Sequence, residues 1–256
     1  MKTLHVERSP EGIVTVALHR PDKKNAIDAT MWDELMAVFR EVAESPSDRV
    51  LVLTGSGGAF CAGADLTPVG DSRHQLDRMH HFGWVGLALH EIPKPTLAKV
   101  NGVAVGAGLN LALGCDLIVA GESARFSEIF VKRGLAIDLG GSWLLPRLVG
   151  LHKAKELALL GEMLDAKEAE RIGIVNRVVP DAELDEFVDD WARRLAAGPP
   201  LALQLTKRML TMGHALSLSE ALHQEAMAQS VTGASEDTAE AMRAFFGKRE
   251  PAFKGR

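Results

Sequence analysis

One stretch near the middle of the chain, NGVAVGAGLNLALGCD (residues 101–116), is rich in glycine and alanine just where an apolar strand gives way to a helix. Glycine weakens a helix by up to about 1 kcal/mol relative to alanine, so its use here indicates that the backbone must stay free of side chains. A second segment of this kind, AFCAGADL (residues 59–66), follows another apolar strand. Small side chains let a ligand approach backbone N–H groups, and those at a helix N-terminus are unpaired. We therefore predict a binding site made largely of main-chain donors.

Around these segments, strands alternate with short helices, which predicts an α/β fold. Short apolar runs predict strands at residues 12–19, 49–54, 96–100, 115–120 and 174–178. Helical spacing of apolar residues predicts a helix after a cap at Asp28 or Thr30, and further helices at 74–91, 106–114, 143–149, 153–160, 166–171, 181–197, 201–212, 217–230 and 235–246. Residues 55–70 are expected to form an irregular glycine-rich loop.

The tetrapeptide AGPP at residues 197–200 is the strongest break in this pattern. Before this tetrapeptide, patterns typical of strands alternate with patterns typical of helices. After it, only helical patterns occur. We predict a mixed core over residues 1–197 and a helical C-terminal module over residues 198–256.

Composition narrows the class of function. The net charge of −5 provides no broad basic field for nucleic acid. The sequence has no stretch of about 18 apolar residues, so it predicts no membrane span. Its first residues lack the apolar region of a signal peptide. Only two cysteines occur, Cys61 and Cys115, which favours a reducing compartment. We expect a cytoplasmic protein without nucleic-acid or membrane partners.

Glycine clusters of this kind have three other interpretations. Gly106, Ala107 and Gly108 match the first part of the dinucleotide motif G-x-G-x-x-G, but Leu111 stands at its third glycine. No G-K-[ST] follows any glycine cluster, which excludes a P-loop. The remaining alternative is that the small residues serve close packing alone.

Four segments, in order, resemble the crotonase, or enoyl-CoA hydratase/isomerase, superfamily. They are AFCAGADL, NGVAVGAGLN with the LALGCDLIVA that follows it, GLAIDLGGSWLLPRLVG (residues 134–150) and the tail KREPAFKGR. The resemblance implies a crotonase-like spiral of ββα units with a helical C-terminal trimerisation module. It also implies homotrimers or dimers of trimers, an acyl-CoA thioester substrate, and no metal or cofactor beyond the coenzyme A of that substrate.

The resemblance assigns the amides of Ala62 and Ala107 to an oxyanion hole for the thioester oxygen. Such donors stabilise the enolate that forms when the carbon next to the thioester loses a proton, and each is typically worth about 2.7–4 kcal/mol. Alanine at position 107, where relatives have glycine, is acceptable because only the N–H is used.

The family's hydratases carry two glutamates that handle a water molecule, and this chain has Asn110 and Phe130 at those two positions. Asp138 matches an aspartate of isomerase-type and dehalogenase-type relatives, and Glu128 is our second choice for the base. Apolar neighbours of Asp138 are expected to raise its pKa. Each acid has a structural alternative, a helix N-cap for Asp138 and a capping acid for Glu128.

A single carboxylate can move a double bond by removing a proton from C2 and returning it to C4, whereas water addition usually needs two acids. We therefore favour enoyl-CoA isomerisation with Asp138 as the base. Two alternatives stay open, a 2-enoyl-CoA hydratase and a non-catalytic acyl-CoA-binding scaffold. A covalent route through Asp138 is disfavoured because no general-base histidine is identified; His80, His81 and His90 are expected at the surface.

The remaining predicted contacts with acyl-CoA come from the resemblance. Residues expected to bind the substrate or its coenzyme A are Lys24, Asn25, Ala26, Ile27, Gly63, Ala64, Asp65, Leu66, Gly106, Phe130, Trp143 and Lys248. Lys248 can act from a neighbouring subunit, and Asp65 is expected to fix its own loop. The acyl pocket is expected to be lined from one helix by Met79, Phe82, Trp84, Leu87 and Leu89, although an ordinary core face has the same pattern.

Overall fold

The computed structural model describes residues 1–67 and 74–256 and contains two sheets. The larger sheet has the order β1-β2-β3-β5-β7-β10, in which only β1 and β2 pair antiparallel. Its strands are β1 (Leu4–Arg8), β2 (Ile13–Leu18), β3 (Val50–Gly55), β5 (Thr96–Val100), β7 (Leu117–Gly121) and β10 (Arg177–Val179). The smaller sheet has the order β4-β6-β8-β9. Its strands are β4 (Ala59–Cys61), β6 (Val103–Val105), β8 (Arg125–Ser127) and β9 (Leu164–Asp165).

The chain alternates between the two sheets, and a helix follows most pairs of strands. β3, β5 and β7 enter the larger sheet, and each is followed at once by a strand of the smaller sheet. The helices of the core are α1 (Ala29–Glu44), α2 (Gln75–His90), α3 (Ala107–Leu113), α4 (Gly141–Val149), α5 (Leu151–Leu160), α6 (Ala166–Arg171) and α7 (Leu184–Ala196), with 3-10 turns at Pro21–Lys23, Ile129–Arg133 and Asp181–Glu183. This succession is the predicted crotonase-like spiral of ββα units.

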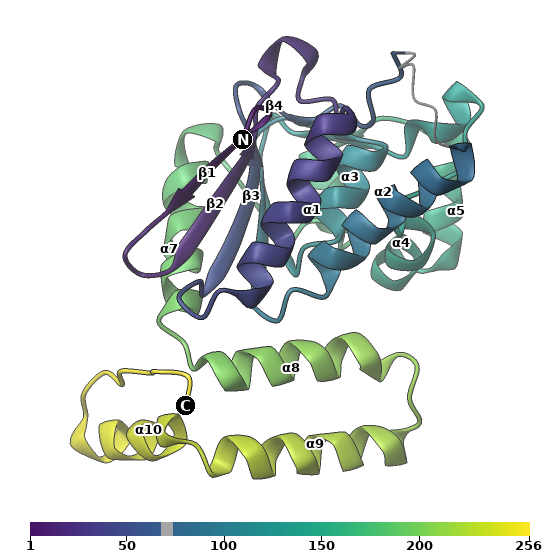
Figure 1. Cartoon of the computed structure of the whole chain (residues 1–256). Coiled ribbons are helices and arrows are strands. Elements are labelled where there is room, and N and C mark those ends of the chain that lie inside the picture. The colour runs from purple at the N-terminus through teal and green to yellow at the C-terminus, as the bar shows by residue number, and fades with distance from the viewer. Residues whose placement is uncertain (68–73) are drawn as a thin grey trace.

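Burial follows from the sequence pattern. All six residues of β3 are buried, as expected for a parallel strand covered on both faces. Helix α1 begins at a cap formed by Asp28, whose side chain accepts from the Met31 amide over 2.9 Å, so Asp28 rather than Thr30 is the cap. Helix α7 lies on the side of the larger sheet opposite α1 (Figure 1), where it covers Val50, Val52 and neighbouring apolar residues.

The last three helices lie apart from the core, below it in Figure 1. They are α8 (Pro200–Gly213), α9 (Leu218–Gly233) and α10 (Glu236–Gly247). The chain passes from α7 to α8 within residues 197–199, where we placed the boundary. Folding of residues 198–256 as a separate unit stays a prediction.

Five strands were not predicted, namely β1, β4, β6, β8 and β9. β4 lies inside the segment expected to be an irregular loop, of which residues 68–70 are outside the described residues. Four of these strands have only two or three residues, too few for a period of two to show. The predicted helices are present, with ends that differ by a few residues. No helix in residues 1–67 or 74–256 has the length and apolar character that a bilayer crossing requires.

Candidate active site

The N-terminus of α3 presents an unpaired amide. Gly106 precedes the helix with φ of 54° and ψ of −128°, a backbone conformation that residues with a side chain rarely adopt. Its own N–H donates to the Ser127 carbonyl oxygen over 2.8 Å. The next amide, that of Ala107, opens the helix and has no acceptor within the described part of the chain.

A second amide lies beside the first. Ile27 donates to the Gly63 carbonyl oxygen over 2.8 Å and accepts from the Asp65 amide over 2.9 Å. In this parallel bridge the N–H of the residue between them, Ala64, points away from Ile27, and no described residue accepts it. A Cβ placed on Gly63 would lie 3.7 Å from the Ala107 nitrogen, so the two chain segments are in contact.

The prediction for Ala62 is wrong. Its amide donates to the Lys24 carbonyl oxygen over 2.9 Å and is therefore occupied within the protein. The positive φ of 93° at Gly63 then turns the backbone, so the unpaired amide comes two residues later, at Ala64. No signal in the sequence distinguishes the two alanines that flank Gly63 in AFCAGADL, because the difference depends on which segment pairs with them.

Asp138 lies in the loop before α4, and burial raises its pKa to about 6. The capping alternative for Asp138 is wrong. The N-cap of α4 is Gly140, and no side chain makes a capping hydrogen bond there. The shift in pKa has the direction that its apolar neighbours predict.

Glu128 lies just before the turn Ile129–Arg133, and only 1% of its surface is exposed. Burial raises its pKa to about 8, the Asp138 carboxylate adds to the rise, and the adjacent Asn110 side chain opposes it. The capping alternative is wrong here too, since its carboxylate makes no capping hydrogen bond. Glu128 is the second choice for the base from the sequence, which gives no sign that the charge of Asp138 acts on it.

Asn110 connects these groups to the amides. It lies three residues after Ala107 in α3, so both are on one face of the helix. Its Nδ2 donates to the Asp138 carbonyl oxygen over 2.9 Å. A Cβ on Gly141 would lie 2.4 Å from the Asn110 amide, so glycine at position 141 leaves the space that this amide occupies.

Four buried oxygens in this cluster have no hydrogen-bond partner in the described residues. They are Oδ1 of Asn110, both carboxylate oxygens of Glu128, and Oδ1 of Asp138. Buried polar atoms without partners are costly, and they are often found where a protein binds a proton, a water molecule or a ligand. We refer to Asn110, Glu128 and Asp138 as the carboxyl cluster.

Several residues predicted to contact coenzyme A serve the protein itself. The Asn25 side chain is fully buried, accepts from the Arg20 amide, and donates to three carbonyl oxygens between Ser56 and Phe60. The amides of residues 25–27 all donate to carbonyls of the chain, so they do not serve as free donors to a ligand. The prediction that coenzyme A rests against the backbone of Asn25, Ala26 and Ile27 stays a prediction; of the three residues, only Ala26 is half-buried rather than buried.

Asp65 anchors its own loop, as expected. Its carboxylate accepts from the Thr67 amide over 3.0 Å and from the Thr67 hydroxyl over 2.6 Å, and it pairs with Arg20 at 3.0 Å. These bonds, those from Thr67 above all, lower its pKa to about 2. Lys24 and Leu66 are exposed.

Three other residues predicted to bind the substrate lie in different parts of the chain. Phe130 is buried, with its ring tip 3.7 Å from a Cβ built on Gly106. Trp143 is partly exposed at the start of α4, and the Arg147 guanidinium lies 3.9 Å above its ring. Lys248 ends α10, which Figure 1 places far from α3 and α4 of the same chain.

Helix α2, which is expected to line an acyl pocket, has both buried and exposed apolar side chains. Leu89 belongs to the core, and Phe82 stacks on Trp32 with ring centroids 4.5 Å apart. Trp84 and Leu87 are exposed, so only part of the predicted set can face a ligand at one place. His90, from the end of this helix, packs edge-on against Trp143 at 5.5 Å, a contact that the sequence did not predict.

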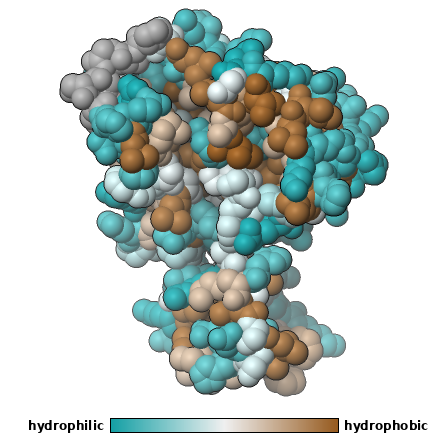
Figure 2. Space-filling view, turned by 90° about the vertical axis from the view of Figure 1, so that its right-hand side faces the viewer, coloured by the Kyte–Doolittle hydropathy of each residue, from teal (hydrophilic) through white to brown (hydrophobic). Residues whose placement is uncertain are grey.

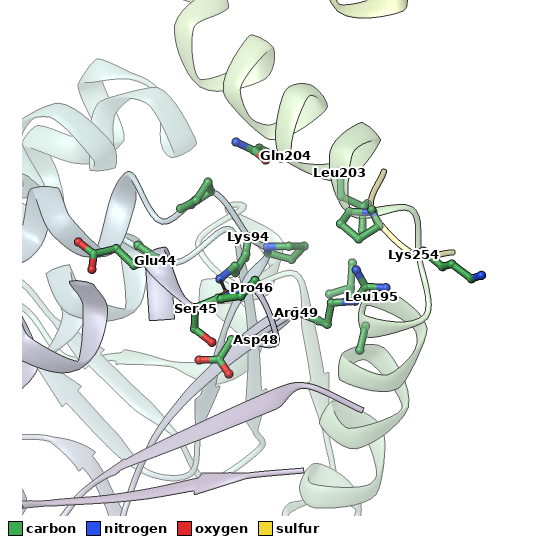
Figure 3. Close-up of a pocket in the computed structure, with 17 residues that line it drawn as sticks. Glu44, Ser45, Pro46, Asp48, Arg49, Lys94, Leu195, Leu203, Gln204 and Lys254 are labelled. Carbon is green, nitrogen blue, oxygen red and sulfur yellow. Dashed lines mark hydrogen bonds between the residues drawn. The ribbon is translucent and has the colours of Figure 1, made fainter. Parts of the chain in front are cut away.

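A separate cavity of about 420 Å³ lies between the end of α1, the segment before β5 and helix α8 (Figure 3). Its wall includes Glu44, Lys94 and Gln204. None of the unpaired amides or carboxyl groups described above lines it. This cavity is therefore distinct from the carboxyl cluster.

Comparison with known proteins shows the same similarity over almost the whole chain. Residues 8–256 match the family model described as enoyl-CoA hydratase/isomerase. The 1,2-epoxyphenylacetyl-CoA isomerase of Escherichia coli K12 is 38% identical over 98% of this chain and 97% of its own length. The 2,3-dehydroadipyl-CoA hydratase of the same strain is 36% identical over the full length of both chains. A crystal structure of an enoyl-CoA hydratase from Bacillus anthracis superposes with a TM-score of 0.94 at 31% identity, covering 99% of this chain and all of that one.

Proposed function

This chain belongs to the enoyl-CoA hydratase/isomerase family, and we propose that it isomerises the double bond of an enoyl-CoA, with Asp138 as the base. The observation that carries the proposal is the difference between the two carboxyl groups. Asp138, with a pKa of about 6, is mostly ionised at neutral pH, whereas Glu128, with a pKa of about 8, is mostly protonated. The site thus offers one base at neutral pH.

In the proposed reaction the thioester oxygen binds to the amides of Ala64 and Ala107. Neither amide has another acceptor among the described residues, and the segments that carry them are in contact. Donors fixed in this way stabilise the negative charge that the oxygen gains when C2 loses its proton. Asp138 takes that proton to form the dienolate and returns it to C4, which leaves the double bond conjugated with the thioester and the carboxylate regenerated.

The hydratase alternative is less well supported. Addition of water needs one group to activate the water and another to protonate C2. Asn110 does not titrate and Phe130 is apolar, so the only acid of the described site that could act beside Asp138 is Glu128, which stands at neither position where the family's hydratases carry glutamate. A 1,2-epoxyphenylacetyl-CoA isomerase and a 2,3-dehydroadipyl-CoA hydratase are about equally similar to this chain, so similarity alone does not decide between double-bond isomerisation and hydration.

A non-catalytic acyl-CoA-binding scaffold is the alternative from another class. A scaffold has no need for buried carboxyl groups without partners, which cost folding stability. The carboxyl cluster thus favours an enzyme.

Coenzyme A is proposed to lie along Lys24, Ala26 and the loop that leads to Leu66, because the side chains of Lys24 and Leu66 are exposed there. Lys248 can contribute only from a neighbouring subunit in this arrangement, because α10 is remote from the site of its own chain (Figure 1). We propose a homotrimer or a dimer of trimers, and a cytoplasmic location, in which the two buried cysteines remain as thiols.

The activity test offers the purified protein a 3-enoyl-CoA and, separately, a 2-enoyl-CoA, while the absorbance of the conjugated thioester is followed. A rise with the first substrate supports the isomerase. A fall with the second and no rise with the first supports the hydratase. No change with either substrate over several chain lengths contradicts catalysis of both kinds and favours the scaffold.

A further inference from the structure

We propose that Glu128 is a neutral acid at the pH of catalysis, pairs with the Asn110 amide and so holds Asp138 in position. Glu128 is a positioning residue in this proposal and does not exchange protons with the substrate. For its effect on catalysis, the inference rests on the proposed role of Asp138.

The proposal is supported by the buried oxygens of Asn110 and Glu128 that have no hydrogen-bond partner among the described residues. The Asp138 carbonyl oxygen can only accept, so the nitrogen of the Asn110 amide must face it, as the 2.9 Å bond shows. The other polar atom of that amide, Oδ1, is buried and needs a donor. A carboxylate has no proton to donate, whereas a carboxylic acid has one.

One arrangement satisfies three of the four orphaned oxygens. A neutral carboxyl group can pair with a primary amide through two hydrogen bonds, donating its O–H to the amide oxygen and accepting from the amide nitrogen. Glu128 lies next to Asn110, and both of its oxygens lack partners. The second N–H of Asn110 remains for the Asp138 carbonyl, so the chain of bonds runs from Glu128 to the loop that carries the base.

Among the residues that the structure describes, no cation acts on the pKa of Glu128. On its own turn, Lys132 pairs with Glu162 at 3.4 Å near the surface, and Arg133 is exposed. The facing helix α3, with the sequence AGLNLAL, has no charged residue. Within the described residues the charge that acts on Glu128 is the Asp138 carboxylate, which disfavours a second negative charge.

Ionisation of Glu128 at alkaline pH would therefore break the pairing. It would place two like charges beside the Asn110 amide and release the Asp138 loop. We expect activity to rise with pH as Asp138 ionises near pH 6 and to fall again near pH 8 as Glu128 ionises.

The test compares Glu128→Gln, which keeps a donor and an acceptor but does not ionise, with Glu128→Leu, which has neither. We expect Glu128→Gln to keep kcat at pH 7 within roughly 3-fold and to lose the alkaline fall, and Glu128→Leu to lose about 10-fold or more at every pH. The exposed Glu162→Gln is the matched control and should keep the wild-type profile. A Glu128→Gln enzyme without activity would overturn the proposal, because it would show that the ionisable group itself is required.

A second readout needs no substrate. A carboxyl whose pKa is higher in the folded than in the unfolded protein holds its proton on folding, so its contribution to stability is lost as pH rises from about 4.5 to about 8. The Tm of Glu128→Gln minus that of the wild type should increase by about 5 °C or more between pH 5 and pH 8.5. A constant difference would show that Glu128 is ionised throughout, which would overturn this inference even if the protein turns over no enoyl-CoA.

Discussion

Two carboxyl groups in one apolar region differ in pKa, and the difference has an identifiable cause. Asp138 keeps partial contact with solvent, whereas Glu128 is almost completely enclosed and also faces the charge of Asp138. Separation of two pKa values by environment is how active sites assign different roles to similar side chains. The sequence predicted the rise for Asp138 from its apolar neighbours, but the enclosure of Glu128 depends on residues far away in the chain.

Replacement of Asp138 by asparagine should abolish most activity while the fold is retained. We expect kcat to fall roughly 10²- to 10⁴-fold, because asparagine cannot accept the proton from C2. Because burial raises the pKa of Asp138 from 3.8 to about 6, its ionisation removes stability as pH rises between these values, so at pH 7.5 the variant should melt at an equal or higher temperature. Retention of wild-type kcat, measured alongside calorimetric melting, would remove Asp138 from the mechanism.

At the scale of elements, the site depends on the close approach of α3 to β4. A Cβ on Gly108 would lie 2.4 Å from the Cys61 carbonyl oxygen and 2.7 Å from its Cβ, so only glycine allows this packing. Close packing thus explains the glycine at position 108, whereas a main-chain binding site at Ala107 stays a proposal. The sequence predicted the long helices from their apolar spacing. It did not predict the short strands of the smaller sheet, because their register comes from partners distant in sequence.

Gly108→Ala should therefore damage both stability and activity. We expect a loss of about 1–3 kcal/mol in the free energy of unfolding, since the clash involves backbone atoms, and a lower kcat because the Ala107 amide moves. Gly83→Ala is the matched control in α2, where no atom lies within 4 Å of the added methyl group. That variant should be as stable as the wild type or up to about 1 kcal/mol more stable. Equal melting of the two variants in denaturant titrations would contradict the packing argument.

At the scale of the whole molecule, apolar side chains remain uncovered on two parts of the single chain. Figure 2 shows hydrophobic residues gathered on the face of the core that carries α4 and α5, and further ones on the helices below. On α10, Phe245 and Phe246 are 75% and 79% exposed. Surfaces of this kind on a monomer mark interaction sites, and they support the proposed homotrimer. The sequence predicted the helices as a module, but the exposed faces could be identified only once the packing was known.

A charged pair on α10 should prevent assembly. We expect the wild type to have a mass near three or six times that of one chain in light scattering coupled to size exclusion, and the double variant Phe245→Glu/Phe246→Glu to shift toward one chain. Glu7→Lys, at the exposed edge strand β1, should leave the mass unchanged. A wild-type protein that elutes as a single chain at micromolar concentration would contradict the oligomer.

The arrangement of the two amides and the carboxyl cluster is tested most directly by a crystal structure of the protein with a non-reactive acyl-CoA. We predict that the thioester oxygen lies within about 2.7–3.1 Å of the Ala64 and Ala107 nitrogens, with C2 facing the Asp138 carboxylate. A thioester bound elsewhere, or an oxygen that accepts from neither amide, would contradict the proposed mechanism.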